Sequence, residues 1–135
     1  MVGILVVSHG RLAQALISSV QFIVGNLKRI KGVSIRPKDG EKEIKNRIQR
    51  KLTEVDDGDG VLILTDILGG TSTSSSLPFL QNEKVEVVTG VNLPMLLTLS
   101  SYRKGRSLKE MGELVRKSGR RSIRLMREVL RLEKK

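Results

Sequence analysis

Two uninterrupted runs of apolar and small residues constrain the fold of this chain more than any other feature of its sequence. They cover residues 2–8 and 61–65, and neither contains a charged side chain. Successive residues of a strand face opposite sides of a sheet, so a run without polar alternation indicates a strand that is buried on both sides. Such strands are typical of parallel sheets that carry helices on both faces.

Segments with helical periodicity alternate with these runs. Apolar residues recur at helical spacing over residues 11–24, and Gly25 and Asn26 end the pattern. The other predicted elements are strands at residues 32–35 and 85–89, and helices at residues 41–55, from the segment 68–76 to about residue 80, and from Pro94 onward. The alternation predicts an α/β fold with an open, mostly parallel, doubly wound sheet of four strands. At 135 residues the chain is expected to be one domain, 1–135.

The C-terminal quarter has a different character. Ser107 and Glu110 have the spacing of a capping box, which predicts the start of a helix, and Gly119 is expected to interrupt that helix. Residues 122–132 are compatible with either a helix or a strand. The segment 103–135 contains 13 Lys and Arg against 4 Asp and Glu, so it carries most of the net charge of +11. It suits an acidic partner, a nucleic acid or a membrane surface, or it is simply a solvated helix face.

Composition excludes several classes of protein. The chain has no cysteine and one histidine, so it lacks a disulfide framework and the ligands of a zinc site, and we expect no metal or other cofactor. The apolar run at residues 2–7 is too short for a secretion signal and follows no basic residue. No run approaches the roughly 20 apolar residues that a membrane-spanning helix needs. These features predict a cytoplasmic protein.

An ionisable residue follows each of the two apolar runs: His9 in "VVSHG" and Asp66 in "LILTDILGG". In open parallel sheets, ligands bind beyond the carboxyl ends of the strands, where the strand order reverses. If the two strands are neighbours, His9 and Asp66 meet at that edge. A carboxylate that accepts a hydrogen bond from one imidazole nitrogen selects the tautomer and leaves the other nitrogen free to act as a nucleophile.

The residues after Asp66 could bind a phosphoryl group. Gly69 and Gly70 permit close approach and unusual dihedral angles, and Thr71 and Ser72 provide hydroxyl and amide groups where a helix is predicted to begin. Each feature also has a simpler explanation. His9 could be a polar residue at the rim, Asp66 could cap a turn, and the "GGTS" stretch could be a tight turn. Their combination favours a phosphohistidine site.

Three motifs, "VVSHGRLAQALISSVQFIVG", "VLILTDILGGTS" and "VVTGVNLPMLL", resemble the enzyme IIA component of the bacterial phosphotransferase system, mannose family. The resemblance implies that His9 accepts a phosphoryl group from the histidine-containing phosphocarrier protein and passes it to a IIB protein. It implies that Asp66 is the hydrogen-bonding partner of His9, and that Gly69, Gly70, Thr71 and Ser72 form the phosphate-facing loop.

The same resemblance implies a homodimer in which a fifth, antiparallel strand, residues 122–127, is exchanged between the two copies. The chain departs from the family pattern in two places. Ser72, Thr73 and Ser74 stand where the family usually has Pro, Phe and Asn, and the basic segment 103–135 is atypical. No IIB domain follows in the sequence, so we expect IIB to be a separate protein.

Two other functions remain open from the sequence. The first is a regulatory phosphohistidine protein that is not coupled to sugar transport. The second is a nucleic-acid-binding module that uses the basic segment 103–135. Only Tyr102 supplies an aromatic ring beside that segment, and no helix-turn-helix or zinc-finger pattern is visible, so we expect nucleic acid not to be the partner.

Overall fold

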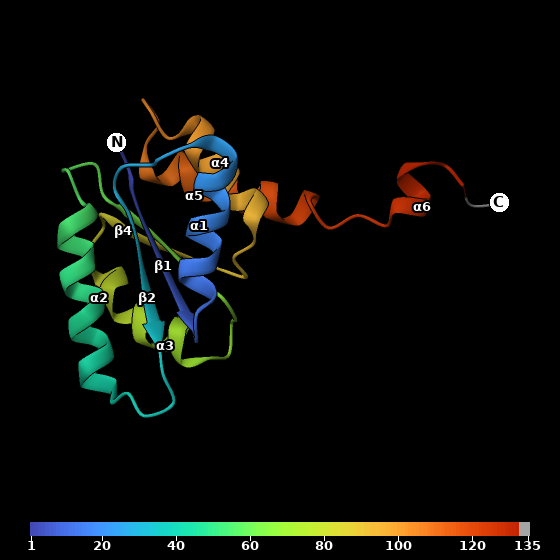
Figure 1. Cartoon of the computed structure of the whole chain (residues 1–135). Helices are drawn as coiled ribbons and strands as arrows, with labels where there is room; N and C mark the ends of the chain where they lie inside the picture. Colours follow the sequence, from blue (N-terminus) through green and yellow to red (C-terminus); the bar gives the residue numbers. More distant parts are fainter. Residues whose placement is uncertain (133–135) are drawn as a thin grey trace.

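The computed structural model describes residues 1–132, so the last three residues of the basic segment 103–135 lie outside the described part. Four strands form one parallel sheet with the order β2-β1-β3-β4, and helices cover both of its faces (Figure 1). The elements are β1 (Gly3–His9), α1 (Leu12–Val24), β2 (Ile30–Ile35), α2 (Glu41–Val55), β3 (Val61–Thr65), α3 (Thr71–Ser76), the 3-10 helix η1 (Leu77–Gln81), β4 (Val85–Thr89), α4 (Leu93–Tyr102), α5 (Leu108–Arg121) and α6 (Met126–Val129).

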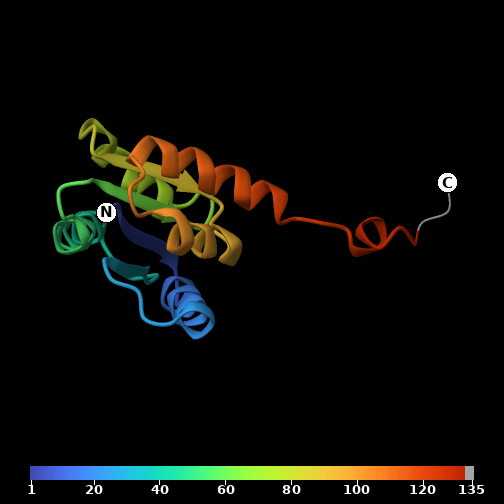
Figure 2. The same cartoon turned by 90° about the horizontal axis from the view of Figure 1, so that it is seen from above.

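The alternation of side chains along the buried strands builds two cores. Ile4 and Val6 of β1 face the helices α1, α4 and α5, whereas Leu5 and Val7 face α2 and η1. All four side chains are fully buried, as the lack of polar alternation in residues 2–8 predicted. Figure 2, seen from above, shows the sheet between these two layers of helices. The predicted doubly wound α/β fold is therefore confirmed.

Predicted and observed elements agree closely, with one difference in the type of helix. The segment predicted as a helix to about residue 80 is α3 followed by η1, which ends at Gln81. Pro78 has no amide hydrogen and lies at the start of η1, where a helix does not need that donor. The capping box is also confirmed: the Ser107 hydroxyl accepts from the Glu110 amide, and the Glu110 carboxylate accepts from the Ser107 amide.

The prediction that Gly119 interrupts α5 is wrong, because the helix continues to Arg121. A Cβ atom on Gly119 would lie 2.9 Å from the Cγ and Sδ atoms of Met95 in α4. The absence of a side chain at Gly119 therefore allows α5 to pack closely against α4, and the helix does not end there.

Residues after α5 leave the body of the molecule (Figures 1 and 2). Residues 123–125 are neither helical nor strand, and α6 then includes Met126 and Arg127. Within the described chain, residues 122–127 pair with no strand of the sheet. The exchanged fifth strand thus remains a prediction about two copies of the chain.

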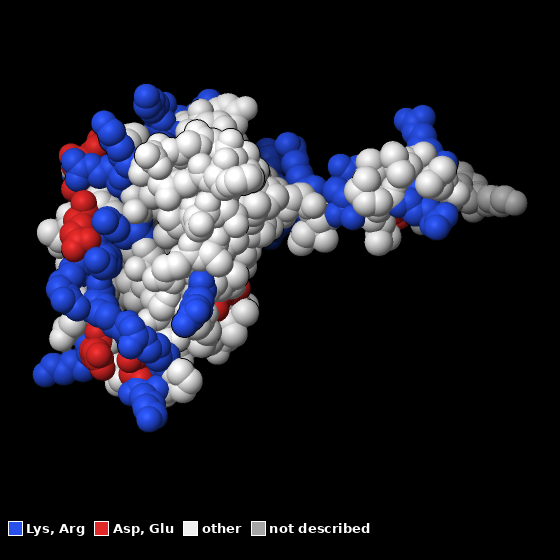
Figure 3. Space-filling view, in the orientation of Figure 1, with Lys and Arg blue, Asp and Glu red and all other residues white. Residues whose placement is uncertain are grey.

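Charged side chains are unevenly distributed over the surface. Helix α1 contains no charged residue, and Figure 3 shows the corresponding uncharged face beside a basic C-terminal extension. Phe22 on α1 is 91% exposed and Ile123 in the extension is 81% exposed. Apolar side chains with such exposure often mark contacts with another protein.

Candidate functional site

Strand order brings the two predicted site residues together. β1 lies next to β3, with Val7 opposite Thr65, so the residues that follow these positions meet at the carboxyl edge of the sheet. The chain moves from β1 to β2 on one side and to β3 on the other, which makes this edge a switch point of the sheet. His9 and Asp66 therefore lie where ligands bind in folds of this type.

The Asp66 carboxylate holds His9 in two ways. Its Oδ2 atom accepts a hydrogen bond from the His9 backbone amide at 2.8 Å and lies 2.9 Å from Nδ1 of the imidazole. Its Oδ1 atom accepts from the Ile67 amide at 3.0 Å and from the Ser72 hydroxyl. An ionised carboxylate can only accept, so in the neutral imidazole this contact favours the tautomer with the proton on Nδ1 and the lone pair on Nε2.

Electrostatics keeps this carboxylate charged although it is largely buried. The Asp66 side chain is 9% exposed, and the His9 side chain is 41% exposed. Burial raises the pKa of the Asp66 carboxyl, but hydrogen bonds from Ser72 and from the backbone and imidazole of His9 outweigh burial, so the pKa lies below its ordinary value of 3.8. An exposed imidazole is thus oriented by a fixed negative charge.

The two glycines of the loop have different environments. A Cβ atom on Gly70 would lie 2.6 Å from Cε1 of His9, so a side chain here would displace the imidazole. Gly69 has open space around it. The expected unusual dihedral angles are absent from both, and the positive φ of 58° instead belongs to Gly10, directly after His9. The signal for Gly10 in the sequence is its position directly after a buried strand and its terminal His9.

The hydroxyl groups that follow have contacts of their own. Ser72 is fully buried and donates to Asp66, so it positions the carboxylate. Thr73 is also buried, and its hydroxyl lies 2.7 Å from that of Thr65. Thr71, the first residue of α3, is exposed. Of the predicted loop, Gly70 and Ser72 are thus in contact with His9 and Asp66, respectively.

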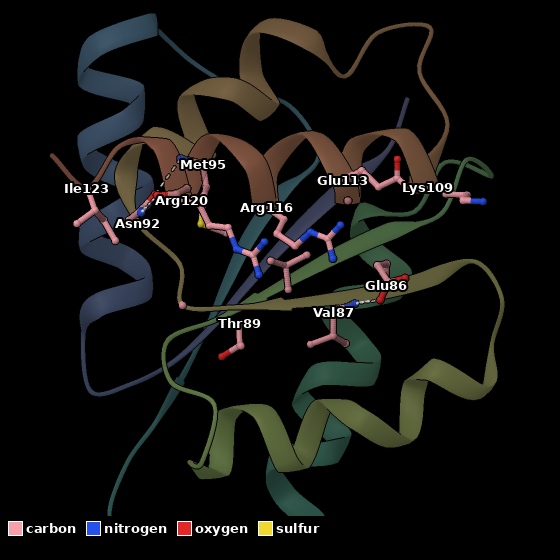
Figure 4. A pocket seen from close by; sticks show the side chains of 14 residues that line it. Glu86, Val87, Thr89, Asn92, Met95, Lys109, Glu113, Arg116, Arg120 and Ile123 are labelled. Carbon is pink, nitrogen blue, oxygen red and sulfur yellow. Dashed lines mark hydrogen bonds between the residues drawn. The ribbon is translucent and has the colours of Figure 1, made fainter.

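A hollow of about 610 Å³ lies elsewhere, between β4 and α5. Figure 4 shows Arg116 and Arg120 reaching from α5 toward β4, with Glu86 on the strand below. None of the residues His9, Asp66 and Gly70 lines it. In residues 1–132 no group of three or more His, Cys, Asp or Glu side chains is arranged to hold a metal ion.

Comparison with known proteins identifies the family. The family model described as the fructose IIA component of the phosphotransferase system matches residues 3–116, which include the whole site described above. The chain belongs to this IIA family. The mannose-family resemblance of the sequence is thereby confirmed, and the IIA chain has a role in sugar phosphotransfer as a component of the phosphotransferase system.

Relatives in sequence and in structure agree with this assignment. The IIA chain is 26% identical over 131 residues to the fructose-specific EIIA component of Bacillus subtilis, covering 96% of this chain and 90% of the relative. It is 26% identical over 128 residues to the mannose-specific EIIAB component of Escherichia coli, covering 93% of this chain and 40% of that relative.

Solved structures of similar fold include a phosphotransferase system EIIA component from Streptococcus agalactiae, with a TM-score of 0.85, 25% identity and coverage of 93% and 98% of the two chains. A IIA protein associated with the fucose utilization operon of Streptococcus pneumoniae has a TM-score of 0.84 and 29% identity, with 95% of each chain covered. Across the described residues of the IIA chain, no helix is long and apolar enough to cross a membrane.

Proposed function

We propose that His9 accepts a phosphoryl group on Nε2 from the histidine-containing phosphocarrier protein and donates it to a separate IIB protein in the cytoplasm. The observation that carries this proposal is the contact of 2.9 Å between Nδ1 of His9 and Oδ2 of Asp66. With the Asp66 carboxylate ionised, this contact supports a proton on Nδ1 and Nε2 as the nucleophile.

The transfer needs no cofactor. The Nε2 lone pair attacks the phosphorus atom of the incoming phosphohistidine, and a new P–N bond forms while the donor's P–N bond breaks. The electron pair of the broken bond returns to the donor imidazole. The proton on Nδ1 stays between His9 and Asp66, where the carboxylate stabilises the positive charge that the phosphorylated ring acquires. Transfer to IIB is the same step in reverse.

The loop after Asp66 supports the phosphoryl group in this proposal. Gly70 presents no side chain toward the imidazole, so its backbone approaches the ring closely. Thr71, the next residue, is exposed, and Gly69 has open space around it. Ser72 acts through Asp66 because its hydroxyl is already engaged there.

Phosphorylation by phosphoenolpyruvate, enzyme I and the phosphocarrier tests this function. We expect acid-labile, alkali-stable phosphate on the wild type and none on His9→Gln, because His9 is the only histidine. Asp66→Asn is expected to slow transfer about a hundredfold, since the amide holds the tautomer less well. A wild-type chain without phosphate, or an unchanged rate in Asp66→Asn, would contradict the respective role.

We also propose that the chain acts as a homodimer in which residues 122–127 of one copy add to β4 of the other. β4 is at the edge of the sheet, and among the described residues its outward Val87 amide bonds only to the Glu86 carboxylate of the same strand, at 2.9 Å. On a strand, Ile123 and Leu125 would face the same side, and both are exposed in the single chain. Val87 of β4 is partly exposed and lines the hollow along this edge.

A further inference from the structure

The last described residues form a surface that the proposed phosphoryl transfer does not use. After α5 the chain extends away from the sheet and its helices to α6 (Figures 1 and 2). The Leu130 amide donates to the Met126 carbonyl at 2.9 Å, and the Leu132 amide donates back to the Arg127 carbonyl, also at 2.9 Å. Arg131, the residue before Leu132, has a positive φ of 56°. This pattern closes the C-terminal end of a helix, so residues 126–132 form a defined helical turn.

One face of this turn is apolar and exposed. Met126, Val129 and Leu130 have the spacing i, i+3 and i+4, which places them on the same side of a helix. These three side chains and that of Leu132 are between 40% and 59% exposed. The exchanged strand proposed above ends at residue 127, so it would cover none of Val129, Leu130 and Leu132. The exposed apolar face therefore indicates a contact other than the one with β4.

The side chains around this face are basic. Arg127 follows Met126 directly, so it lies on a different side of the helix, about 100° away. Seven cations lie between residues 114 and 132: Arg116, Lys117, Arg120, Arg121, Arg124, Arg127 and Arg131. Glu128 is the single acid in this stretch. None of the seven cations forms an ion pair within residues 1–132, and Figure 3 shows Lys and Arg side chains projecting from the extension beside uncharged ones.

Three kinds of partner could neutralise these cations, and the side chains favour one of them. Arginine on the polar face, with leucine and similar side chains on the other, is typical of helices that lie on the surface of a bilayer. Residues 103–132 contain no aromatic side chain, so the stacking surface that single-stranded nucleic acids need is missing. A groove of an acidic protein would contact little more than three apolar side chains, whereas anionic lipids can gather around all seven cations.

We propose that residues 121–132 bind the surface of a bilayer that contains anionic phospholipids. In this arrangement Met126, Val129 and Leu130 enter the boundary between headgroups and acyl chains, and the neighbouring arginines contact the lipid phosphates. Each Lys or Arg close to such a surface strengthens binding about fivefold. The inference goes beyond the proposed phosphoryl transfer and does not depend on it, because none of these residues forms a hydrogen bond or ion pair with His9 or Asp66.

A tryptophan reporter tests whether this segment enters a bilayer. The chain has no tryptophan, so a single introduced indole reports its own surroundings. The probe is vesicles of phosphatidylcholine and phosphatidylglycerol in equal parts, with vesicles of phosphatidylcholine alone as the comparison. We expect the emission of Leu130→Trp to move to shorter wavelength with the anionic vesicles only. Phe22→Trp, at the exposed end of α1, is the matched control and is expected to keep its emission unchanged.

Cosedimentation with the anionic vesicles measures the contribution of charge. At about 0.1 M salt, Arg121→Glu/Arg131→Glu is expected to weaken binding about thirtyfold or more. Lys42→Glu/Arg50→Glu makes the same charge change at exposed positions of α2, on the other face of the sheet, and is expected to weaken binding less than about threefold. Arg121 and Arg131 lie outside residues 122–127, so the mass of the proposed dimer is expected to stay the same.

The variant Val129→Ser/Leu130→Ser separates insertion of the apolar face from attraction by charge alone. It keeps the net charge and removes two of the apolar side chains, so we expect it to weaken binding to the anionic vesicles about tenfold. Unchanged binding in this variant would mean that the apolar face stays outside the bilayer, and it would contradict the inference.

Three other results would overturn the inference. They are an emission of Leu130→Trp that does not move, an Arg121→Glu/Arg131→Glu variant that binds as tightly as its α2 control, and a wild type that binds duplex DNA but not the anionic vesicles. A wild type that takes up phosphate on His9 without binding vesicles would overturn this inference alone. A wild type that binds vesicles but takes up no phosphate would overturn the proposed function alone.

Discussion

Each oxygen of the Asp66 carboxylate accepts from two donors, one pair supplied by His9 and the other by Ile67 and Ser72. This arrangement orients the His9 imidazole and, with Asp66 ionised, favours the tautomer of the neutral ring that carries its proton on Nδ1. Asp66 also acts as a turn cap, because its Oδ1 atom accepts from the Ile67 amide. The Asp66 carboxylate therefore contacts His9 and caps the turn at the same time.

The lowered pKa of Asp66 has a consequence for stability at acid pH. A carboxyl group whose pKa is lower in the folded chain stabilises it above the ordinary value of 3.8 and loses this contribution as the pH falls through the folded-state pKa. We expect Asp66→Asn to unfold at lower urea concentration than the wild type at about pH 7, and the gap to narrow below about pH 3.8. Urea unfolding at both pH values measures this gap. If the wild type and Asp66→Asn differ in stability by the same amount at both pH values, the ionised Asp66 carboxylate does not stabilise the fold.

Gly70 and Gly69 form a matched pair for the loop. Gly70→Ala would place a Cβ atom against the His9 ring, whereas Gly69→Ala meets open space. We expect Gly70→Ala to slow phosphoryl loading more than about tenfold and to destabilise the fold by about 1 kcal/mol, through overpacking. Gly69→Ala should load at nearly the wild-type rate. Loading rates and thermal unfolding of the two variants measure the difference, and equal rates would show that the close approach at Gly70 is unimportant.

At the scale of elements, sequence patterns that depend on contacts within a few residues predicted the structure correctly, whereas a position that depends on contact between two helices was predicted wrongly. The capping box of α5 was predicted because Ser107 and Glu110 are three residues apart and contact each other. The predicted interruption at Gly119 was wrong, because this glycine leaves room for the Met95 side chain of another helix. Helix propensity alone does not distinguish a break from a site of close packing.

The capping box offers a test of stability that leaves the site untouched. Ser107→Ala removes the hydroxyl that accepts from the Glu110 amide at 3.1 Å, so we expect a loss of about 1 kcal/mol in the free energy of unfolding. Ser101→Ala, at an exposed position near the end of α4, is the control and should change stability by less than about 0.5 kcal/mol. Urea unfolding measures both. If Ser107→Ala is as stable as the wild type, the cap contributes little to the free energy of unfolding.

At the scale of the whole molecule, one chain has both an exposed apolar segment after α5 and an unpaired sheet edge at β4. Both are explained if two copies exchange residues 122–127, which would cover apolar side chains and satisfy the backbone groups of an edge strand. The uncharged face of α1, with Phe22 at its exposed end, is a second surface on which two copies could meet. The two surfaces can be distinguished by experiment.

We expect light scattering to give the mass of a dimer for the wild type and of a monomer for Ile123→Asp/Leu125→Asp, because charged side chains would be buried in the exchanged strand. Phe22→Asp places the same charge on the exposed face of α1 and should remain a dimer. A monomeric wild type would contradict the dimer. Dissociation by Phe22→Asp alone would place the interface on α1.

The amino-acid sequence was enough to predict the strands and most helices, the capping box, and His9 and Asp66 as the ionisable residues that follow two buried runs. These features follow from periodicity and from contacts between residues close in the chain. Four features became visible only in the folded chain: β1 and β3 are neighbours, the Ser72 hydroxyl donates to Asp66, Gly10 and not Gly69 has a positive φ, and Gly119 packs on Met95. Each depends on residues that meet through folding, and local patterns carry no information about which elements become neighbours.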